Sequence, residues 1–183
     1  MQPELTSPLL VFLCLALIIA SIFDLKYQKI PNLITVTVAI AAIIFHFIFF
    51  GLQGLMFSGA GLLLGMAVFL PFYAFGGMGA GDVKLMGSVG AVVGAKGVFI
   101  SAVLTGIFGG VYALLLLLVY HRYGRAMLSR AWAVLKTFLL TRQYVPVSTP
   151  NPVQEMPRLS YGLAIALGTG TYLLYFPAGF ELF

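Results

Sequence analysis

Six apolar runs, several of them near the length that crosses a lipid bilayer, constrain this fold more than any other feature of the sequence. They are approximately Pro8–Phe23, Leu33–Phe50, Leu55–Phe75, Val83–Ala95, Val98–Tyr120 and Leu159–Phe176. A soluble domain carries roughly 25% charged residues, whereas this chain of 183 residues carries 8%. We therefore expect an all-α, polytopic membrane helix bundle with about six transmembrane helices.

The basic residues between these runs predict the orientation of the chain. With the N-terminus outside, nine of them fall on the cytoplasmic side: Lys26, Lys29, Lys84, Arg122, Arg125, Arg130, Lys136, Arg142 and Arg158. Only Lys96 falls outside, which is the bias typical of membrane proteins. This orientation in a lipid bilayer explains the net charge of +5, so we expect no nucleic-acid partner.

The connection of about residues 121–158 is predicted to lie in the cytoplasm, within a single membrane domain of residues 1–183. On a helical projection, Arg122, Arg125, Ser129, Lys136 and Thr137 share one side, opposite Met127, Leu128, Ala131, Val134, Leu135, Phe138 and Leu139. Such an amphipathic helix suits the lipid interface, and a surface helix packed on the bundle fits the pattern equally well. The proline-rich VPVSTPNPVQEMP that follows is expected to be an extended tether.

Two expectations concern packing inside the membrane. The small-residue pairs Gly61/Gly65 and Gly90/Gly94 should let helices approach each other closely. His46, near the outer end of the second apolar run, is expected at the membrane interface and is not assigned as a metal ligand. A single cysteine, Cys14, leaves no disulfide and no cysteine-based zinc site within one chain.

Asp24 and Asp82 are the only aspartates in the chain, and both stand at the ends of apolar runs. In the expected topology both ends face the cytoplasm, so the two carboxylates reach the same depth from distant sequence positions. Two neighbouring carboxylates cannot both ionise cheaply, so one holds a proton while the other is charged. The charged one can take a proton from an attacking water while the protonated one polarises a peptide carbonyl, without a metal.

Two other interpretations fit the same two aspartates. Each can mark a membrane boundary or cap a helix, and Asp82 is placed to be the N-cap of the fourth segment. Alternatively, the pair can line a proton or cation path in a small coupled transporter. Gly76, Gly77, Gly79 and Gly81 precede Asp82, and the ~13 residues of the fourth run cover only ~20 Å of a ~30 Å hydrocarbon core. A glycine loop that dips into the bilayer and carries a carboxylate into a wet pocket suits hydrolysis.

Three blocks of the sequence resemble a known family. Gly79-Ala80-Gly81-Asp82 resembles the GxGD signature of membrane aspartyl proteases, and the longer GGMGAGDVKLMGSVGAVVG resembles the second catalytic region of type IV prepilin peptidases. FDLKYQKIPNLIT, from Phe23 to Thr35, resembles the first region. RLSYGLAIALGTG, from Arg158 to Gly170, is similar to the last-helix segment, with Ser160 where proline often precedes Tyr-Gly. The blocks lie in the expected order and span nearly the whole chain.

The resemblance implies an aspartic-type endopeptidase that removes the short basic leader of prepilins at the cytoplasmic membrane face, just before their apolar helix. Asp24 and Asp82 match the two catalytic aspartates. Many members also methylate the new N-terminus and carry a cysteine-rich zinc insert where this chain has only Leu25–Asn32. The resemblance therefore favours the small, peptidase-only form of the enzyme that is found with tight-adherence (Flp-type) pili. It implies an enzyme of the inner (plasma) membrane without methyltransferase activity, metal or other cofactor. Archaeal-type preflagellin peptidases share the aspartates and are an alternative.

Five further residues are expected to bind substrate or shape the site. Lys84 either steadies charge near the aspartates or anchors its helix on the cytoplasmic side. Pro31 and Asn32 suit the start of the second helix, as a first-turn proline and a polar cap. Gly79 and Gly81 permit a tight backbone path and a close approach to substrate.

Overall fold

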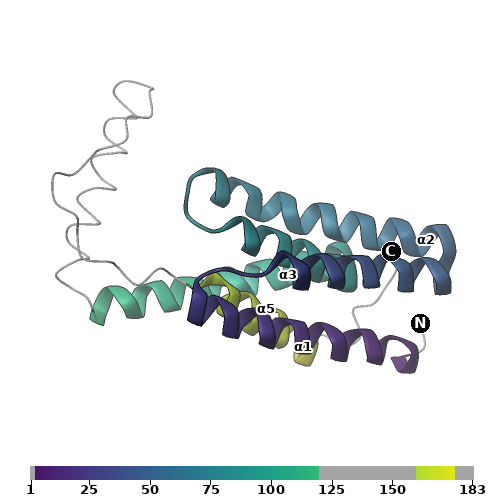
Figure 1. Cartoon of the computed structure of the whole chain (residues 1–183), viewed down its shortest axis with the longest axis horizontal. Coiled ribbons are helices and arrows are strands. Elements are labelled where there is room, and N and C mark those ends of the chain that lie inside the picture. The colour runs from purple at the N-terminus through teal and green to yellow at the C-terminus, as the bar shows by residue number, and fades with distance from the viewer. Residues whose placement is uncertain (1–2, 120–159, 176–183) are drawn as a thin grey trace, which may run out of the picture. The chain divides into compact units, whose positions relative to one another are not determined.

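The computed structural model describes residues 3–119 and 160–175, whose regular secondary structure is entirely helical. The helices are α1 (Pro3–Tyr27), α2 (Asn32–Ala74), α3 (Ala80–Val119) and α5 (Tyr161–Tyr175) (Figure 1). The prediction of an all-α bundle is therefore confirmed. The predicted cytoplasmic connection, residues 121–158 with its amphipathic helix, lies outside the described residues.

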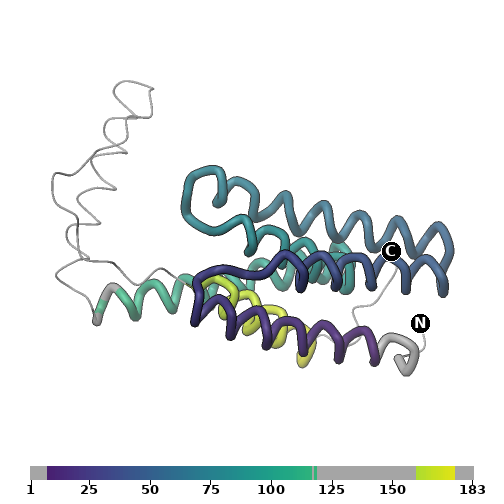
Figure 2. Tube along the Cα trace, viewed as in Figure 1, coloured from purple at the N-terminus to yellow at the C-terminus, as the bar shows by residue number. Residues whose placement is uncertain are grey.

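Both α2 and α3 bend sharply at a glycine with positive φ. Gly51 has φ 58° and ψ −139°, and Gly94 has φ 75° and ψ −179°, which are backbone angles that glycine adopts at little cost. After the first bend the chain returns alongside itself (Figure 2). Ser58 Oγ lies 3.4 Å from the carbonyl oxygen of Ala42, 16 residues earlier, although a straight helix would separate them by about 24 Å. The six predicted runs thus correspond to α1, two arms of α2, two arms of α3, and α5.

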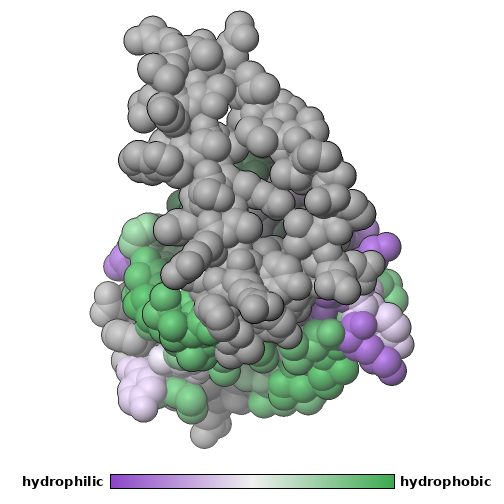
Figure 3. Space-filling view, turned by 90° about the vertical axis from the view of Figure 1, so that its left-hand side faces the viewer, coloured by the Kyte–Doolittle hydropathy of each residue, from purple (hydrophilic) through white to green (hydrophobic). Residues whose placement is uncertain are grey.

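Three helices in the described ranges are long and apolar enough to cross a membrane. Their apolar spans are Pro8–Tyr27, Asn32–Ala74 and Ala80–Leu116. Large apolar side chains cover much of their outer surface, seen as broad green areas in Figure 3. Apolar surface exposed to this extent is typical of a protein surface that contacts lipid or another protein. The chain is therefore a membrane protein, while the number of crossings stays a prediction.

Glycines bring the arms of α2 and α3 into close contact. Gly61 and Gly90 face each other so closely that a Cβ on either would collide with the backbone of the other. A Cβ on Gly65 would meet the backbone of Met86 at 2.5 Å. The predicted packing role is confirmed for Gly61, Gly65, Gly90 and Gly94, since a Cβ on Gly61 would also meet the backbone of Gly94 at 2.9 Å. Gly94 forms the bend in α3 as well.

The chain divides into two compact units, Met1–Gly109 with Leu159–Phe183, and Gly110–Arg158. Within the first unit, α1 packs against both α2 and α5. The buried apolar core of this unit comes mostly from α1, α2 and α3, with Ile165 and Tyr172 added by α5. Only the end of α3, residues 110–119, is described in the second unit. Every candidate site residue lies in the first unit.

Candidate active site

Asp82 is the third residue of α3, and its side chain reaches back to the residue before the helix. Its Oδ2 accepts a hydrogen bond from the backbone N–H of Gly79 at 3.0 Å, and its own N–H donates to the Gly79 carbonyl at 3.1 Å. A carboxylate in the first turn that bonds the N-cap amide is one half of a capping box. Asp82 is therefore not the N-cap, as one interpretation of the sequence had it, because Gly79 holds that position.

The two glycines of the GxGD motif stand where a side chain would meet a neighbour. A Cβ on Gly79 would lie 3.3 Å from Oδ2 of Asp82, and a Cβ on Gly81 would lie 3.1 Å from Cβ of Ile30. Ile30 belongs to the short connection between α1 and α2. Gly81 therefore lets the start of α3 press against the end of the α1–α2 turn, which brings Asp82 towards α1.

Asp24 lies in the last turn of α1 and meets the first turn of α5. Its Oδ2 accepts a hydrogen bond from the backbone N–H of Gly162 at 2.8 Å. Gly162 is the second residue of α5, and its N–H is one of the donors that the start of a helix leaves unpaired. Ser21, one turn earlier on α1, donates from Oγ to the Gly162 carbonyl at 3.3 Å and to the Leu17 carbonyl at 2.8 Å.

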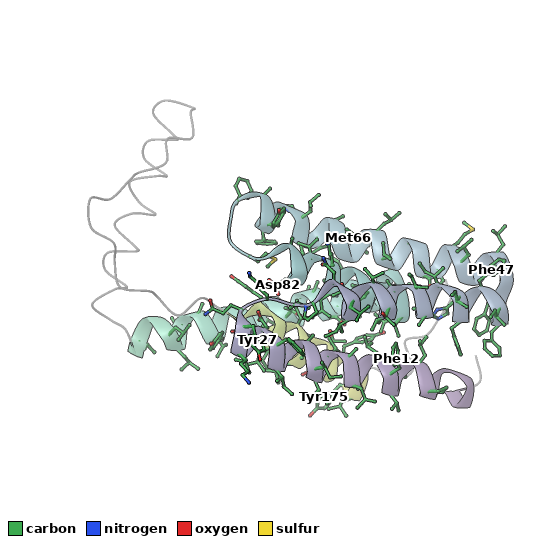
Figure 4. All side chains as sticks on the ribbon, in the orientation of Figure 1. Phe12, Tyr27, Phe47, Met66, Asp82 and Tyr175 are labelled. Carbon is green, nitrogen blue, oxygen red and sulfur yellow. The ribbon has the colours of Figure 1, made fainter. Side chains whose placement is uncertain are left out.

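The structure brings the two aspartates together at one end of the helices. Each is 7% exposed, and they are close enough for the charge of Asp24 to act on Asp82. Tyr161, which precedes Gly162, is also within electrostatic reach of Asp82. Figure 4 shows Asp82 at the same end as Tyr27, the last residue of α1, with Phe47 at the opposite end. Two helices far apart in sequence thus supply one buried carboxylate pair.

One buried oxygen of this pair has no hydrogen-bond partner within the described part of the chain. It is Oδ1 of Asp82, which is buried. Leaving a buried acceptor unpaired costs about 1–3 kcal/mol, and more for a charged group. A proton on the carboxyl group, a water or a bound molecule would satisfy it. The pair can therefore hold one proton and engage a water or a polar substrate group, which are the two requirements of general acid–base catalysis.

A sequence profile of the type IV leader peptidase family matches residues 11–114, more than half of the chain. The chain belongs to the type IV leader peptidase family. It is thus a membrane peptidase, and the matched region contains both aspartates and the glycine loop but ends before α5. No curated protein and no solved structure matches the chain significantly.

Lys84 and Asn32 of the peptidase bond to each other. Lys84 Nζ donates to Oδ1 of Asn32 at 3.0 Å in an exposed position, which links α3 to the start of α2. Pro31 occupies the N-cap position of α2, and that position has no side-chain cap bond. The expected places are therefore shifted by one residue: Pro31 precedes the helix, and Asn32 is its first residue and not its cap.

A second buried polar cluster in the peptidase surrounds His46, whose predicted place at the membrane interface is wrong because its side chain is 0% exposed. His46 Nδ1 lies 2.9 Å from the carbonyl oxygen of Ala42 and 2.9 Å from Oγ of Ser58. Ser58 Oγ donates in turn to the carbonyl of Ala91 at 2.7 Å. This histidine cluster (His46, Ser58, Ala42 and Ala91) joins both arms of α2 to α3.

Sequence reasoning missed the contributions of three residues to these two clusters. Ser21 and Ser58 were not singled out, and Gly162 appeared only inside a longer block. A signal for Ser58 exists in the sequence, because it completes the helical 4-3-4 spacing of Gly54, Ser58, Gly61 and Gly65, which marks the buried face of an α2 arm. No comparable local signal marks Ser21, since its partner Gly162 is 141 residues away.

Within residues 3–119 and 160–175, no group of three or more histidine, cysteine, aspartate or glutamate side chains is arranged to hold a metal ion.

Proposed function

We propose that this peptidase is an aspartic-type endopeptidase that removes the short basic leader of prepilins at the cytoplasmic face of the inner (plasma) membrane. One observation carries the proposal: Asp24 and Asp82 are both buried, lie within electrostatic reach of each other, and are each held through Oδ2 by a glycine N–H. Membership of the type IV leader peptidase family supports a leader peptide as the substrate class.

The chemistry follows from sharing one proton between the two carboxyl groups. The charged carboxylate takes a proton from a water as the water oxygen attacks the peptide carbonyl carbon. The protonated carboxyl donates a hydrogen bond to the carbonyl oxygen, whose negative charge grows during the attack. Proton transfer to the amide nitrogen then lets the C–N bond break, which yields the leader carboxylate and the free N-terminus of the pilin. Both aspartates are needed, and each changes its role within one cycle.

The orientation proposed for this centre rests on the basic residues. Lys26 and Lys29 follow Asp24, and Lys84 follows Asp82, so the positive-inside bias supports a cytoplasmic site. The bends at Gly51 and Gly94 support six crossings with the glycine loop on that same side. A prepilin would then keep its basic leader in the cytoplasm while its apolar helix enters among the helices of the bundle.

A peptidase without methyltransferase activity is the form we propose. α1 ends at Tyr27 and α2 begins at Asn32, so the connection where many relatives carry a zinc-binding insert is very short. This supports the small form that serves tight-adherence (Flp-type) pili. Archaeal-type preflagellins are the alternative substrates, and cleavage of purified leader peptides of both kinds would separate the two.

The test replaces each aspartate by its amide in a cell that lacks its own prepilin peptidase. Asp24→Asn and Asp82→Asn should each leave full-length prepilin uncleaved, because loss of acid–base catalysis costs about 10²–10⁴-fold. Glu155→Gln, the same acid-to-amide change in the long connection, is the matched control and should process normally.

Two outcomes would contradict the proposal. An aspartate that serves only to accept a backbone hydrogen bond tolerates asparagine, whose amide oxygen accepts the same bond, so normal processing by either variant at matched membrane levels would remove that aspartate from the mechanism. A wild-type protein that leaves prepilin intact but conducts protons in vesicles would assign the pair to a transport path.

A further inference from the structure

We propose that Gly162 is a positioning residue of the catalytic centre, acting through the backbone N–H that it donates to Asp24. The inference rests on the proposed function. It concerns a residue beyond the region of family match, which ends at residue 114, and gives the first turn of α5 a part in the chemistry.

The two aspartates are supported in the same way. Oδ2 of Asp82 accepts from the N–H of Gly79 at 3.0 Å, and Oδ2 of Asp24 accepts from the N–H of Gly162 at 2.8 Å. In both cases the donor is a main-chain amide at the start of a helix, where it has no partner within the helix. Gly162 therefore supports Asp24 in the same way as the motif glycine Gly79 supports Asp82. Each bond fixes one carboxylate oxygen and leaves the other for water or substrate.

Only glycine leaves room for this contact. A Cβ at position 162 would lie 3.0 Å from both Cβ and Oδ2 of Asp24 and 3.2 Å from its Cγ. These separations are shorter than ordinary van der Waals contact. A side chain there would displace the carboxylate from the amide that orients it, even if the helices themselves stayed in place.

Residues of α1 contact both backbone polar groups of Gly162, its N–H and its carbonyl. Asp24 accepts from its N–H, and Ser21, three residues earlier on the same face of α1, shares its one hydroxyl proton between the Gly162 carbonyl at 3.3 Å and the Leu17 carbonyl at 2.8 Å. Ser21 and Asp24 are both buried. Gly162 is thus fixed relative to α1 independently of the hydrogen bond to Asp24, so the N–H is directed at the carboxylate before substrate arrives.

The experiment compares two identical substitutions in one helix of the full-length protein in lipid nanodiscs. Gly162→Ala places a methyl group against Asp24. Gly170→Ala, two turns later, places one where nothing lies within 4 Å. The substrate is a synthetic peptide with a basic leader and an apolar segment, chosen because the wild-type protein cleaves it. We expect Gly162→Ala to lower kcat about 10²-fold, the cost of misplacing a reacting group by about 1 Å. KM and the unfolding midpoint should stay close to those of Gly170→Ala.

The split between kcat and KM separates positioning from other roles. Wild-type kcat in folded Gly162→Ala, or a raised KM with unchanged kcat, would overturn the proposal. If that variant fails to fold, Ser21→Ala decides, because it adds no atom and removes one bond that fixes Gly162. It should lower kcat about fivefold, the worth of about 1 kcal/mol, and an unchanged kcat would overturn the proposal. A wild-type protein that cleaves no leader peptide would instead refute the proposed function itself.

Discussion

The aspartate site (Asp24, Asp82, Gly79 and Gly162) and the histidine cluster are both buried polar groups among apolar helices, yet they are built differently. In the histidine cluster, side chains bond to side chains and to carbonyls of the helix interior. In the aspartate site, both carboxylates bond to main-chain amides at helix starts. Side-chain bonds that span several helices hold helices together, whereas helix-start amides hold a charge.

Each region also leaves one buried atom without a partner in the described residues, and its surroundings differ. His46 Nε2 belongs to a ring that packs 5.1 Å from the ring of Phe57 and is 0% exposed. Asp82 Oδ1 belongs to a side chain that keeps 7% exposure. His46 Nε2 is thus surrounded by aromatic rings, whereas Asp82 Oδ1 is buried within electrostatic reach of a second carboxylate. The comparison fits a stabilising role for the first region and the proposed chemistry for the second.

The largest expected effect concerns the aspartate site as a unit. The double variant Asp24→Asn/Asp82→Asn should lose about as much activity as either single variant, because residues that act together are grossly non-additive. Single-turnover cleavage of a leader peptide by all three proteins measures this. If the double variant is slower by the product of the two single effects, the aspartates act independently and do not share a proton.

Substitution in the histidine cluster should lower the stability of the protein and leave its activity nearly unchanged. His46→Ala removes a fully buried ring and should lower the free energy of unfolding by about 2–4 kcal/mol. The kcat of the remaining folded protein should stay within about threefold. Unfolding in mixed detergent micelles and cleavage at low temperature measure the two quantities. Lost activity with unchanged stability would move the cluster into the mechanism and break the comparison.

A smaller loss of stability is expected for Ser58→Ala. The change removes the donor to the Ala91 carbonyl and a partner of His46 but leaves a small side chain in place. Interhelical hydrogen bonds in membranes contribute about 0.6 kcal/mol on average, with a maximum near 1.7. The free energy of unfolding should therefore fall by about 1 kcal/mol. A cost equal to that of His46→Ala would mean that the two residues act only as a pair.

The smallest effect is expected for Lys84→Met, next to the aspartate site. Its bond to Asn32 is exposed, and exposed polar pairs typically contribute under about 1 kcal/mol. Activity and unfolding midpoint should both change little. Steady-state kinetics would show an exception: a raised KM would assign Lys84 to substrate binding, and a tenfold loss of kcat would place it in the catalytic centre.

The helical bundle could be predicted because apolar runs carry their own signal. Each predicted run corresponds to a helix or a helix arm. The bends were harder to place, since Gly51 and Gly94 look in the sequence like any of the 21 glycines. Their positive φ follows from the way the chain folds back on itself. The position of His46 was predicted wrongly for a related reason. Its burial depends on contacts with Ser58 and with α3, which the sequence around His46 does not reveal.

The two aspartates could be found because acidic residues are rare in this chain, with only five present. The residues that bond to the aspartates could be predicted from the sequence only in part. Gly79 could be proposed from its place in a short motif. Its capping bond to Asp82 spans three residues and could have been read from the spacing. The contact of Gly162 with Asp24 spans 138 residues, and nothing in the local sequence indicates which helix would supply that donor.

This difference in span sets an order of assembly during synthesis. The donor for Asp82 is present as soon as α3 begins, whereas the donor for Asp24 is translated 138 residues after Asp24 itself. At 5–20 residues per second, the delay is roughly 7–28 s. A nascent or truncated chain that lacks α5 therefore carries Asp24 without the amide that orients it. On the proposal that Gly162 orients a catalytic Asp24, proteolytic competence becomes a property of the finished polypeptide, and an incomplete peptidase left in the membrane is inert towards its neighbours.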